Sequence, residues 1–323
     1  MSGSRNPTAS GPADELVQAG YWRHAGSVVC GAAGSVTTGL LLGHRWIPNY
    51  YGAGSAVDTA LPWLGLLSVV SLVCAVVLRA RYSTLIAGVG AVVATVLFGP
   101  ALVHRPAPGP HDLRVATLNV GADNPDPART ARAVADAGAD LVALQELTDA
   151  NNRIAQRVLD PSYPFRHRAG TVGLWSKLPL AHVESVDIDI GWVRALRAQV
   201  SVEGGAMTVF VAHLASARPG LTADRDHTLS ALADRVMSEG TDRVLVVGDL
   251  NTAPTDRKMA EFSELRDTQL EGGRGLGFTY PAALPVMRPD HILQRRMHTR
   301  RAWVTRVPGS DHRLVLADLD TTA

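Results

Sequence analysis

Three long apolar runs without a charged residue dominate the first third of the chain. They cover residues 25–43, 59–78 and 82–103, which is 19, 20 and 22 residues. A helix rises about 1.5 Å per residue and the hydrocarbon core of a bilayer is about 30 Å thick, so each run is long enough to cross. Buried helices of a globular core and a cleaved signal peptide are the alternatives. The number of runs and their flanking arginines favour a three-helix transmembrane anchor within residues 22–103, after a polar N-terminal segment at 1–21.

The arginines near these runs indicate an orientation. Arg5 and Arg23 precede the first run, and Arg79 and Arg81 lie between the second and the third. The loop between the first and second runs holds only Arg45. Because loops rich in Lys and Arg stay in the cytoplasm, we expect a multi-pass protein of the cell membrane with a cytoplasmic N-terminus. Three crossings then place the rest of the chain outside the cytoplasm.

A proline-rich stretch separates the apolar third from the remainder. Residues 104–110 read HRPAPGP, a composition that favours an extended linker. The following residues, 111–323, carry 25 Lys and Arg against 27 Asp and Glu, a net charge of −2, while the whole chain is at +1. This charge argues against a protein that follows a nucleic-acid backbone.

Short apolar stretches with turn residues between them predict a series of strands in residues 111–323. The expected strands cover 113–120, 141–145, 165–175, 181–190, 194–202, 208–214, 244–248, 290–294, 302–307 and 314–319. Helices are expected over 128–137 and 222–238. Many strands with a few covering helices predict packed sheets with helices outside, an α/β layered fold.

Polar side chains stand where the apolar strands stop. A carboxylate, amide or imidazole occupies such a place in six segments, namely Asn119, Glu146, His213, Asp249 with Asn251, Asp290, and Asp311 with His312. Burying these groups is unfavourable unless they have partners. Because strand ends on one edge of a sheet lie close in space, we expect the six segments to converge on a shared site.

In order and in local sequence, these segments resemble the endonuclease/exonuclease/phosphatase superfamily, the DNase I-like enzymes. The resemblance rests on QE at 145–146, GDLN at 248–251 and SDH at 310–312, with GLWSKLPL at 173–180 as a further likeness. It covers essentially all of residues 111–323. It implies a four-layered α/β/β/α sandwich, here preceded by three transmembrane helices.

The resemblance also implies a metal site. Glu146 would be the principal ligand of Mg²⁺, with Mn²⁺ as the alternative ion, and Asn119 and Asp311 would lie close to it. Hard divalent cations prefer carboxylate and amide oxygens and also bind substrate phosphate. Several relatives carry an acidic residue two positions after the first Asn, where this chain has Gly121, so a second metal site on that side is not expected.

The remaining residues would act on the phosphate, again by resemblance. Asp249 would orient or deprotonate the attacking water, and Asn251, two residues on, would lie on the same face of an extended chain and bind a phosphate oxygen. His312 would act as a base or as a hydrogen-bond donor in the transition state, oriented by Asp290. His213 would bind phosphate or help to protonate the leaving group.

Together these features predict a membrane-anchored, Mg²⁺-dependent phosphohydrolase outside the cytoplasm, acting on a phosphate ester or pyrophosphate. The anchor indicates a lipid-linked substrate, and the chain is similar to actinobacterial membrane-anchored members of the superfamily associated with glycopeptide resistance. An extracytoplasmic nuclease is the alternative, with Arg295, Arg296, Arg300 and Arg301 as a local basic patch. A non-catalytic membrane scaffold is the third, disfavoured because no catalytic residue is missing.

Overall fold

The computed structural model describes residues 12–103, 109–218 and 220–322, so most of the expected linker at 104–110 lies outside the described residues. The chain divides into two compact units. The first contains the chain up to Ile47 and residues Ala60–Gly99. The second contains Pro100 onward together with Pro48–Thr59, which connect the first two apolar runs and begin the second helix.

Three helices carry the apolar runs: α1 (Pro12–Gly43), α2 (Ala53–Val77) and α3 (Arg81–Val103). Short 3₁₀ turns at His44–Trp46 and Tyr50–Gly52 connect α1 to α2. All three helices are long and apolar enough to cross a membrane, which confirms the expectation of three spanning helices before the folded domain.

Small residues allow these helices to approach closely within the first unit. A Cβ on Gly34 would lie 3.1 Å from that of Ala87, and one on Gly90 would lie 2.7 Å from the Ser68 hydroxyl. The Ser68 hydroxyl in turn donates a 2.8 Å hydrogen bond to Thr37. Close backbone approach and hydroxyl pairing are typical of helix association in lipid.

Two six-stranded sheets form the second unit. In strand order, the first sheet consists of β11 (His298–Arg306), β12 (Arg313–Asp320), β1 (Leu113–Asn119), β2 (Leu141–Gln145), β4 (Val172–Ser176) and β3 (Phe165–Ala169). In strand order, the second consists of β5 (Leu180–Ser185), β6 (Ala195–Val202), β7 (Gly205–His213), β8 (Arg243–Asp249), β10 (Asp290–Arg295) and β9 (Arg266–Asp267). The pairs β1–β2 and β7–β8 are parallel, and the other pairs are antiparallel.

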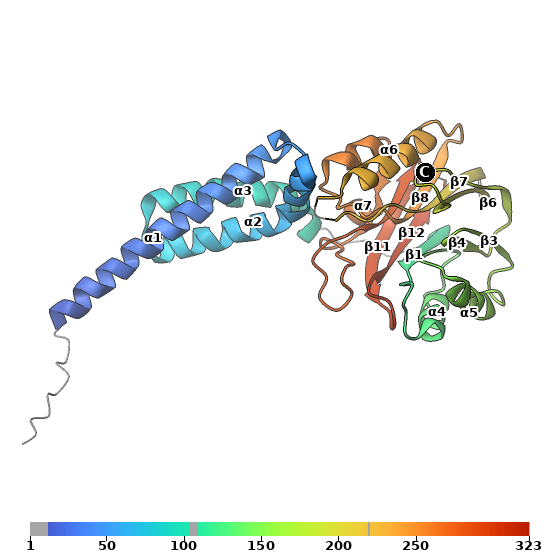
Figure 1. Ribbon diagram of the computed structural model, residues 1–323, viewed down its shortest axis with the longest axis horizontal. Coiled ribbons are helices and arrows are strands. Elements are labelled where there is room, and N and C mark those ends of the chain that lie inside the picture. Colours follow the sequence, from blue (N-terminus) through green and yellow to red (C-terminus); the bar gives the residue numbers. More distant parts are fainter. Residues whose placement is uncertain (1–11, 104–108, 219, 323) are drawn as a thin grey trace, which may run out of the picture. The chain divides into compact units, whose positions relative to one another are not determined.

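Helices cover the outer faces of the two sheets. The helices α4 (Pro127–Asp136) and α5 (Asp149–Leu159) lie against the first sheet, and α6 (Ala223–Met237) lies against the second (Figure 1). One buried apolar cluster fills the space between the sheets, and two others lie between each sheet and its helices. The arrangement confirms the predicted four-layered α/β/β/α sandwich.

The structure corrects two of the predicted strands. The stretch 165–175 is a hairpin, not one strand, because Gly170 takes φ +57° between β3 and β4. The stretch 181–190 is extended only to Ser185, since Asp189 turns back with φ +58° and donates its N–H to the Asp187 carboxylate at 2.9 Å. The helices α5 and α7 (Thr268–Gly272) were not predicted.

The end of β8 requires a residue without a side chain at position 248. Its φ is +141°, and a Cβ there would lie only 1.9 Å from the carbonyl oxygen of Ala212 in the neighbouring strand β7. No side chain fits at that distance, so only glycine allows β8 to reach Asp249 in this register.

We therefore predict that Gly248→Ala lowers stability by roughly 2–4 kcal/mol, because the strand must shift to relieve the clash. Scanning calorimetry of the full chain in detergent would measure the change in Tm. Gly240→Ala is the matched control, since nothing lies within 4 Å of a Cβ at that position. Equal melting temperatures for the two variants would contradict the steric argument.

Candidate functional site

The register of the second sheet brings three predicted residues to one edge. The strand β8 ends at Asp249, which pairs with His213 at the end of the parallel strand β7. On the other side Asp249 pairs with Asp290, the first residue of the antiparallel strand β10. The three side chains are neighbours because their strands stop or start at the same level.

The first sheet presents its own polar residues in the same way. Asn119 ends β1 opposite Gln145 of the parallel strand β2, so Glu146 follows directly beside it. The antiparallel strand β12 begins at Arg313 on the other side of β1, which places Asp311 and His312 near the same edge.

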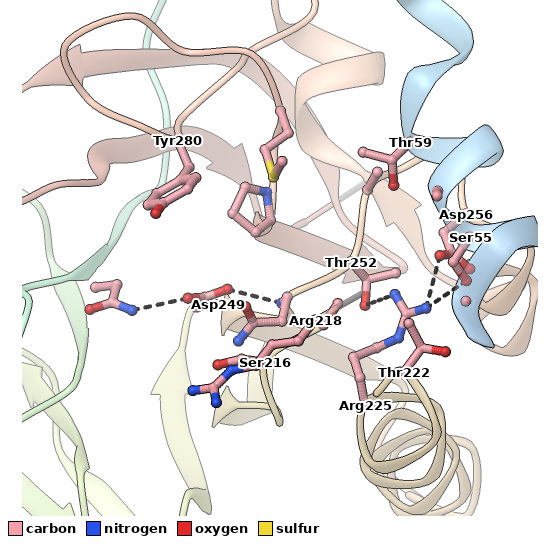
Figure 2. Close-up of a pocket in the computed structure, with 18 of the residues that line it drawn as sticks. Ser55, Thr59, Ser216, Arg218, Thr222, Arg225, Asp249, Thr252, Asp256 and Tyr280 are labelled. Atoms are coloured by element: carbon pink, nitrogen blue, oxygen red, sulfur yellow. Dashed lines mark hydrogen bonds and ion pairs between the residues drawn. The ribbon is translucent and has the colours of Figure 1, made fainter. Parts of the chain in front are cut away.

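One pocket of about 610 Å³ collects these side chains. Seven of the eight predicted site residues line it, namely Asn119, Glu146, His213, Asp249, Asn251, Asp311 and His312. The eighth, Asp290, lies behind His312 and is fully buried. The convergence that the strand ends predicted is therefore present, and Figure 2 shows Asp249 and Tyr280 on the pocket wall.

Asn119 connects the two sheets at this edge. Its Nδ2 donates to Glu146 Oε1 and to Asp249 Oδ2, both at 3.0 Å. Glu146 Oε2 accepts a further bond from the backbone N–H of Ala122 at 2.9 Å. The two carboxylates are thereby held at fixed positions beside each other.

The backbone of Glu146 is strained in a way that serves the site. Its φ is +57°, the left-handed region that a side chain with a Cβ seldom adopts. The conformation aims the carboxylate at the pocket, where the side chain remains one-third exposed. Strain of this kind persists only where surrounding contacts enforce it, and it is concentrated at functional sites.

His312 and Asp290 form a buried pair. Nδ1 of His312 lies 2.8 Å from Asp290 Oδ2, which also accepts the Thr279 hydroxyl at 2.5 Å. Burial alone would lower the pKa of His312, but the carboxylates of Asp290, Asp249 and Asp311 raise it to about 10. The ring therefore carries a proton on Nδ1 toward Asp290, and its Nε2 lies 3.9 Å from Asp249 Oδ2.

His213 differs from His312 in its protonation state, and the cause is Arg194, a residue that the sequence analysis missed. The Arg194 guanidinium donates to His213 Nδ1, so the proton of the neutral ring is on Nε2. That atom lies 3.8 Å from Glu146 Oε1 and 3.7 Å from Asp249 Oδ2. Burial lowers the pKa of His213 to about 4. The positive charges of Arg194 and His312 also lower it, whereas the Asp249 carboxylate acts to raise it.

Arg194 is itself buried, and its guanidinium lies 4.8 Å from the centre of the Trp192 ring. Burial lowers its pKa, and the carboxylates of Asp249 and Glu146 oppose that shift. An arginine at the start of the predicted strand 194–202 was the signal available in the sequence. The role of Arg194 depends on the pairing of β6 with β7. This pairing continues beyond β6, because the N–H of His213 donates to the Arg194 carbonyl at 2.9 Å.

Asn251 reaches the pocket by a turn and not by an extended strand, so the reason given for its position was wrong. The strand β8 stops at Asp249, whose Oδ1 accepts the backbone N–H of Asn251 at 2.9 Å. Asn251 takes φ +47°, and its Nδ2 donates to the Leu214 carbonyl at 3.0 Å. The side-chain cap of Asp249 is what brings both residues to the same pocket.

The donor set fits a divalent cation. Four carboxylates gather at this edge, from Glu146, Asp249, Asp290 and Asp311, against the positive charges of His312 and Arg194. The buried carboxylates of Asp249 and Asp290 are balanced by His312 and Arg194, whereas Glu146 is one-third exposed and Asp311 is exposed. The unbalanced carboxylates therefore lie on the solvent side of the pocket, and carboxylate and amide oxygens are the ligands that hard divalent cations prefer.

The tightest group of metal-binding atoms among the described residues is Asp249, Asp290 and His312, which lie within 4.8 Å of one another. This differs from the predicted set of Glu146, Asn119 and Asp311. Asp290 and His312 bond to each other through Oδ2 and Nδ1, which leaves Asp290 Oδ1 and His312 Nε2 as the atoms that they could offer to an ion. Glu146 has its carboxylate on the pocket side and keeps lone pairs beyond its two bonds.

A two-sheet sandwich with acids, amides and imidazoles gathered at the facing strand ends defines a class of metal-dependent enzymes that hydrolyse phosphate esters. The sequence profile of the endonuclease/exonuclease/phosphatase family matches residues 116–312. The chain belongs to this family. Among curated proteins, none matches the sequence significantly.

Solved structures share the fold of the second unit at low identity. A single-stranded DNA product complex of TDP2 from D. rerio is 20% identical, with a TM-score of 0.56 over 65% of this chain and 99% of that one. A mannosyl-6-phosphatase from Bacteroides thetaiotaomicron is 16% identical, with a TM-score of 0.55 over 64% and 99%. A family protein from the same organism is 16% identical, with a TM-score of 0.56 over 67% and 98%.

We predict that His312→Ala lowers kcat about 10²- to 10⁴-fold on any phosphate ester that the native chain cleaves, because a proton-bearing group at the pocket is lost. Steady-state hydrolysis with Mg²⁺ measures the effect, and calorimetry checks that the fold is retained. His227→Ala is the control, since that imidazole is 63% exposed and lies outside the pocket. Equal kcat values for both variants would contradict a catalytic place for His312.

Proposed function

We propose that the protein is a membrane-anchored, Mg²⁺-dependent phosphohydrolase that cleaves a lipid-linked phosphate ester or pyrophosphate outside the cytoplasm. The observation that carries the proposal is the convergence of seven predicted residues on one pocket in a chain with three membrane-spanning helices. A tether of this kind raises the effective concentration of substrates that are themselves in the bilayer.

Glu146 is the residue placed best to hold Mg²⁺, with Asn119 fixing its carboxylate and Asp311 on the same wall of the pocket. The bound ion would neutralise charge on the phosphate oxygens and so make the phosphorus accessible to water. Mn²⁺ prefers the same oxygen ligands and is the alternative ion.

Side chains of the pocket accept the proton of the attacking water and donate hydrogen bonds to the phosphate and leaving oxygens. Asp249, held by Asn119 and by the N–H of Asn251, accepts a proton from the water that attacks phosphorus. His312, oriented by Asp290, donates from Nε2 to a phosphate oxygen. As the bond to the leaving oxygen breaks, the Nε2–H of His213 is available to that oxygen.

Asn251 supports binding of the phosphate. One of its two amide hydrogens bonds to the Leu214 carbonyl, which leaves the second for a phosphate oxygen in the pocket. Neutral donors of this kind offset charge that grows on the phosphate as water attacks.

The contacts of the basic cluster argue against the nuclease alternative. Arg295 and Arg296 pair with Glu264 and Asp242, and Arg300 pairs with Asp320. Arg301 stacks on Trp303 at 4.4 Å. Arg295 also ends β10, the strand that begins with Asp290, so the cluster lies toward the end of the strand away from the site. These arginines therefore do not form the cationic groove that a nucleic acid needs beside the reacting phosphate, and Arg218 is the exposed arginine among the pocket-lining residues.

The positive-inside pattern of the arginines supports the orientation, with a cytoplasmic N-terminus and the catalytic unit outside. This orientation is consistent with a lipid substrate that is presented at the outer face of the membrane.

Purified full-length protein in nanodiscs with Mg²⁺ tests the proposal. Three substrates should be compared at equal concentration: a polyisoprenyl diphosphate in the same bilayer, a phospholipid, and single-stranded DNA. We expect release of phosphate from the lipid diphosphate, abolished by chelation and by Asp249→Asn. Cleavage of DNA alone would contradict the proposal and favour the nuclease.

A further inference from the structure

The segment that connects the first two membrane-spanning helices is built into the catalytic unit. Asp58 is fully buried and accepts hydrogen bonds from Nε of Arg257 at 2.7 Å and from its backbone N–H at 3.0 Å. The hydroxyl of Thr255 donates to the Asp58 carbonyl at 2.6 Å. Breaking a buried ion pair of this kind is strongly destabilising, so the segment is fixed in place.

A second buried ion pair holds the same segment. The guanidinium of Arg225, only 1% exposed, donates to Ser55 at 2.8 Å, to Thr252 at 3.0 Å and to Asp256 at 3.0 Å (Figure 2). These bonds, with one more to Asp226 at 2.8 Å, use four of the five N–H donors of Arg225 within the protein. Arg225 therefore holds the pocket wall together.

The segment also positions the loop that follows β7. The carbonyl of Tyr51 accepts the N–H of Gly220 at 3.0 Å. Gly52 takes φ +79°, and a Cβ there would lie 2.5 Å from the methyl group of Thr222. The loop before α6 and the first turn of α2 therefore form one continuous surface.

That surface is part of the same pocket as the catalytic side chains. Beyond Glu146 and His312, the pocket is lined by polar and by small apolar residues. The polar ones include Ser55, Thr59, Ser216, Arg218 and Thr222, and the apolar ones include Ala53, Ala56, Ala217, Ala253 and Met287. The small apolar residues provide a patch that can take an uncharged, apolar group next to the phosphate.

The pocket wall and the second apolar run belong to one helix. Residues 53–59 are the first two turns of α2, and this helix continues to Val77.

We infer that residues 51–59, which belong to the second unit, form a subsite for the apolar group bonded to the reacting phosphate. The inference rests on the proposed hydrolysis in the same pocket and names the part of the protein that selects the substrate. Ala56 is exposed to the pocket, so a larger side chain there fills the subsite without touching a catalytic group.

Binding of methyl phosphate and hexyl phosphate to the full chain with Mg²⁺, measured by calorimetry in nanodiscs, tests the subsite without requiring turnover. The native chain is expected to bind hexyl phosphate at least about tenfold more tightly, which corresponds to burial of about two methylene groups. Ala56→Leu should reduce that ratio to below about threefold and leave methyl phosphate unchanged. Ala53→Leu should act in the same direction.

Val57→Leu is the matched control, because it makes the same side chain one residue further along the helix at a position that does not line the pocket. Its ratio should equal the native one. A native ratio near one, or equal ratios in the Ala56 and Val57 variants, would overturn the subsite. If the ratio behaves as expected but no lipid diphosphate is hydrolysed, the proposed reaction fails and the subsite stands.

Discussion

The hydrogen bonds of one amide hold the two halves of the site together. Asn119 belongs to the first sheet, yet its Nδ2 bonds both to Glu146 beside it and to Asp249 of the second sheet. Two neighbouring carboxylates repel each other unless donors or cations balance them. A neutral amide that donates to both fixes their spacing. The Nε2 atoms of the two histidines lie 3.7 and 3.9 Å from the Asp249 carboxylate that this amide holds.

The two imidazoles of the site have different protonation states because they have different neighbouring residues. His312 faces the buried carboxylate of Asp290 and keeps its proton, with a pKa near 10, whereas His213 receives the Arg194 guanidinium and stays neutral, with a pKa near 4. Each ring presents Nε2 to the same pocket. One site thus contains a charged donor and a neutral donor, which suits a phosphate that gains charge on two different oxygens.

Much of this site could be predicted from the sequence because strand ends are visible there. Asn119, Glu146, His213 and Asp249 each close an apolar stretch, and parallel pairing brings such ends together. Arg194 could not be found in this way, since its role depends on which strand pairs with which. The turn at Asn251 was missed because a side-chain cap, not strand alternation, sets its direction.

The segment 48–59 was missed for a further reason. Hydropathy separates a chain into spans and loops, and it assigns the first turns of α2 to the anchor. Their buried contacts to Arg225 and Arg257 arise from residues about 170 to 200 positions away, which no local pattern reveals. Residues 48–59 therefore belong with the catalytic unit, and residues 51–53, 55, 56 and 59 contribute to the wall of its pocket.

Titration of the full chain with Mn²⁺, followed by electron paramagnetic resonance, tests the central claim that these groups gather around a divalent ion at Glu146. The account predicts one tightly bound ion, whose affinity falls by about tenfold or more in Glu146→Gln and stays unchanged in Glu184→Gln, an exposed carboxylate outside the pocket. Unchanged affinity in Glu146→Gln would contradict it.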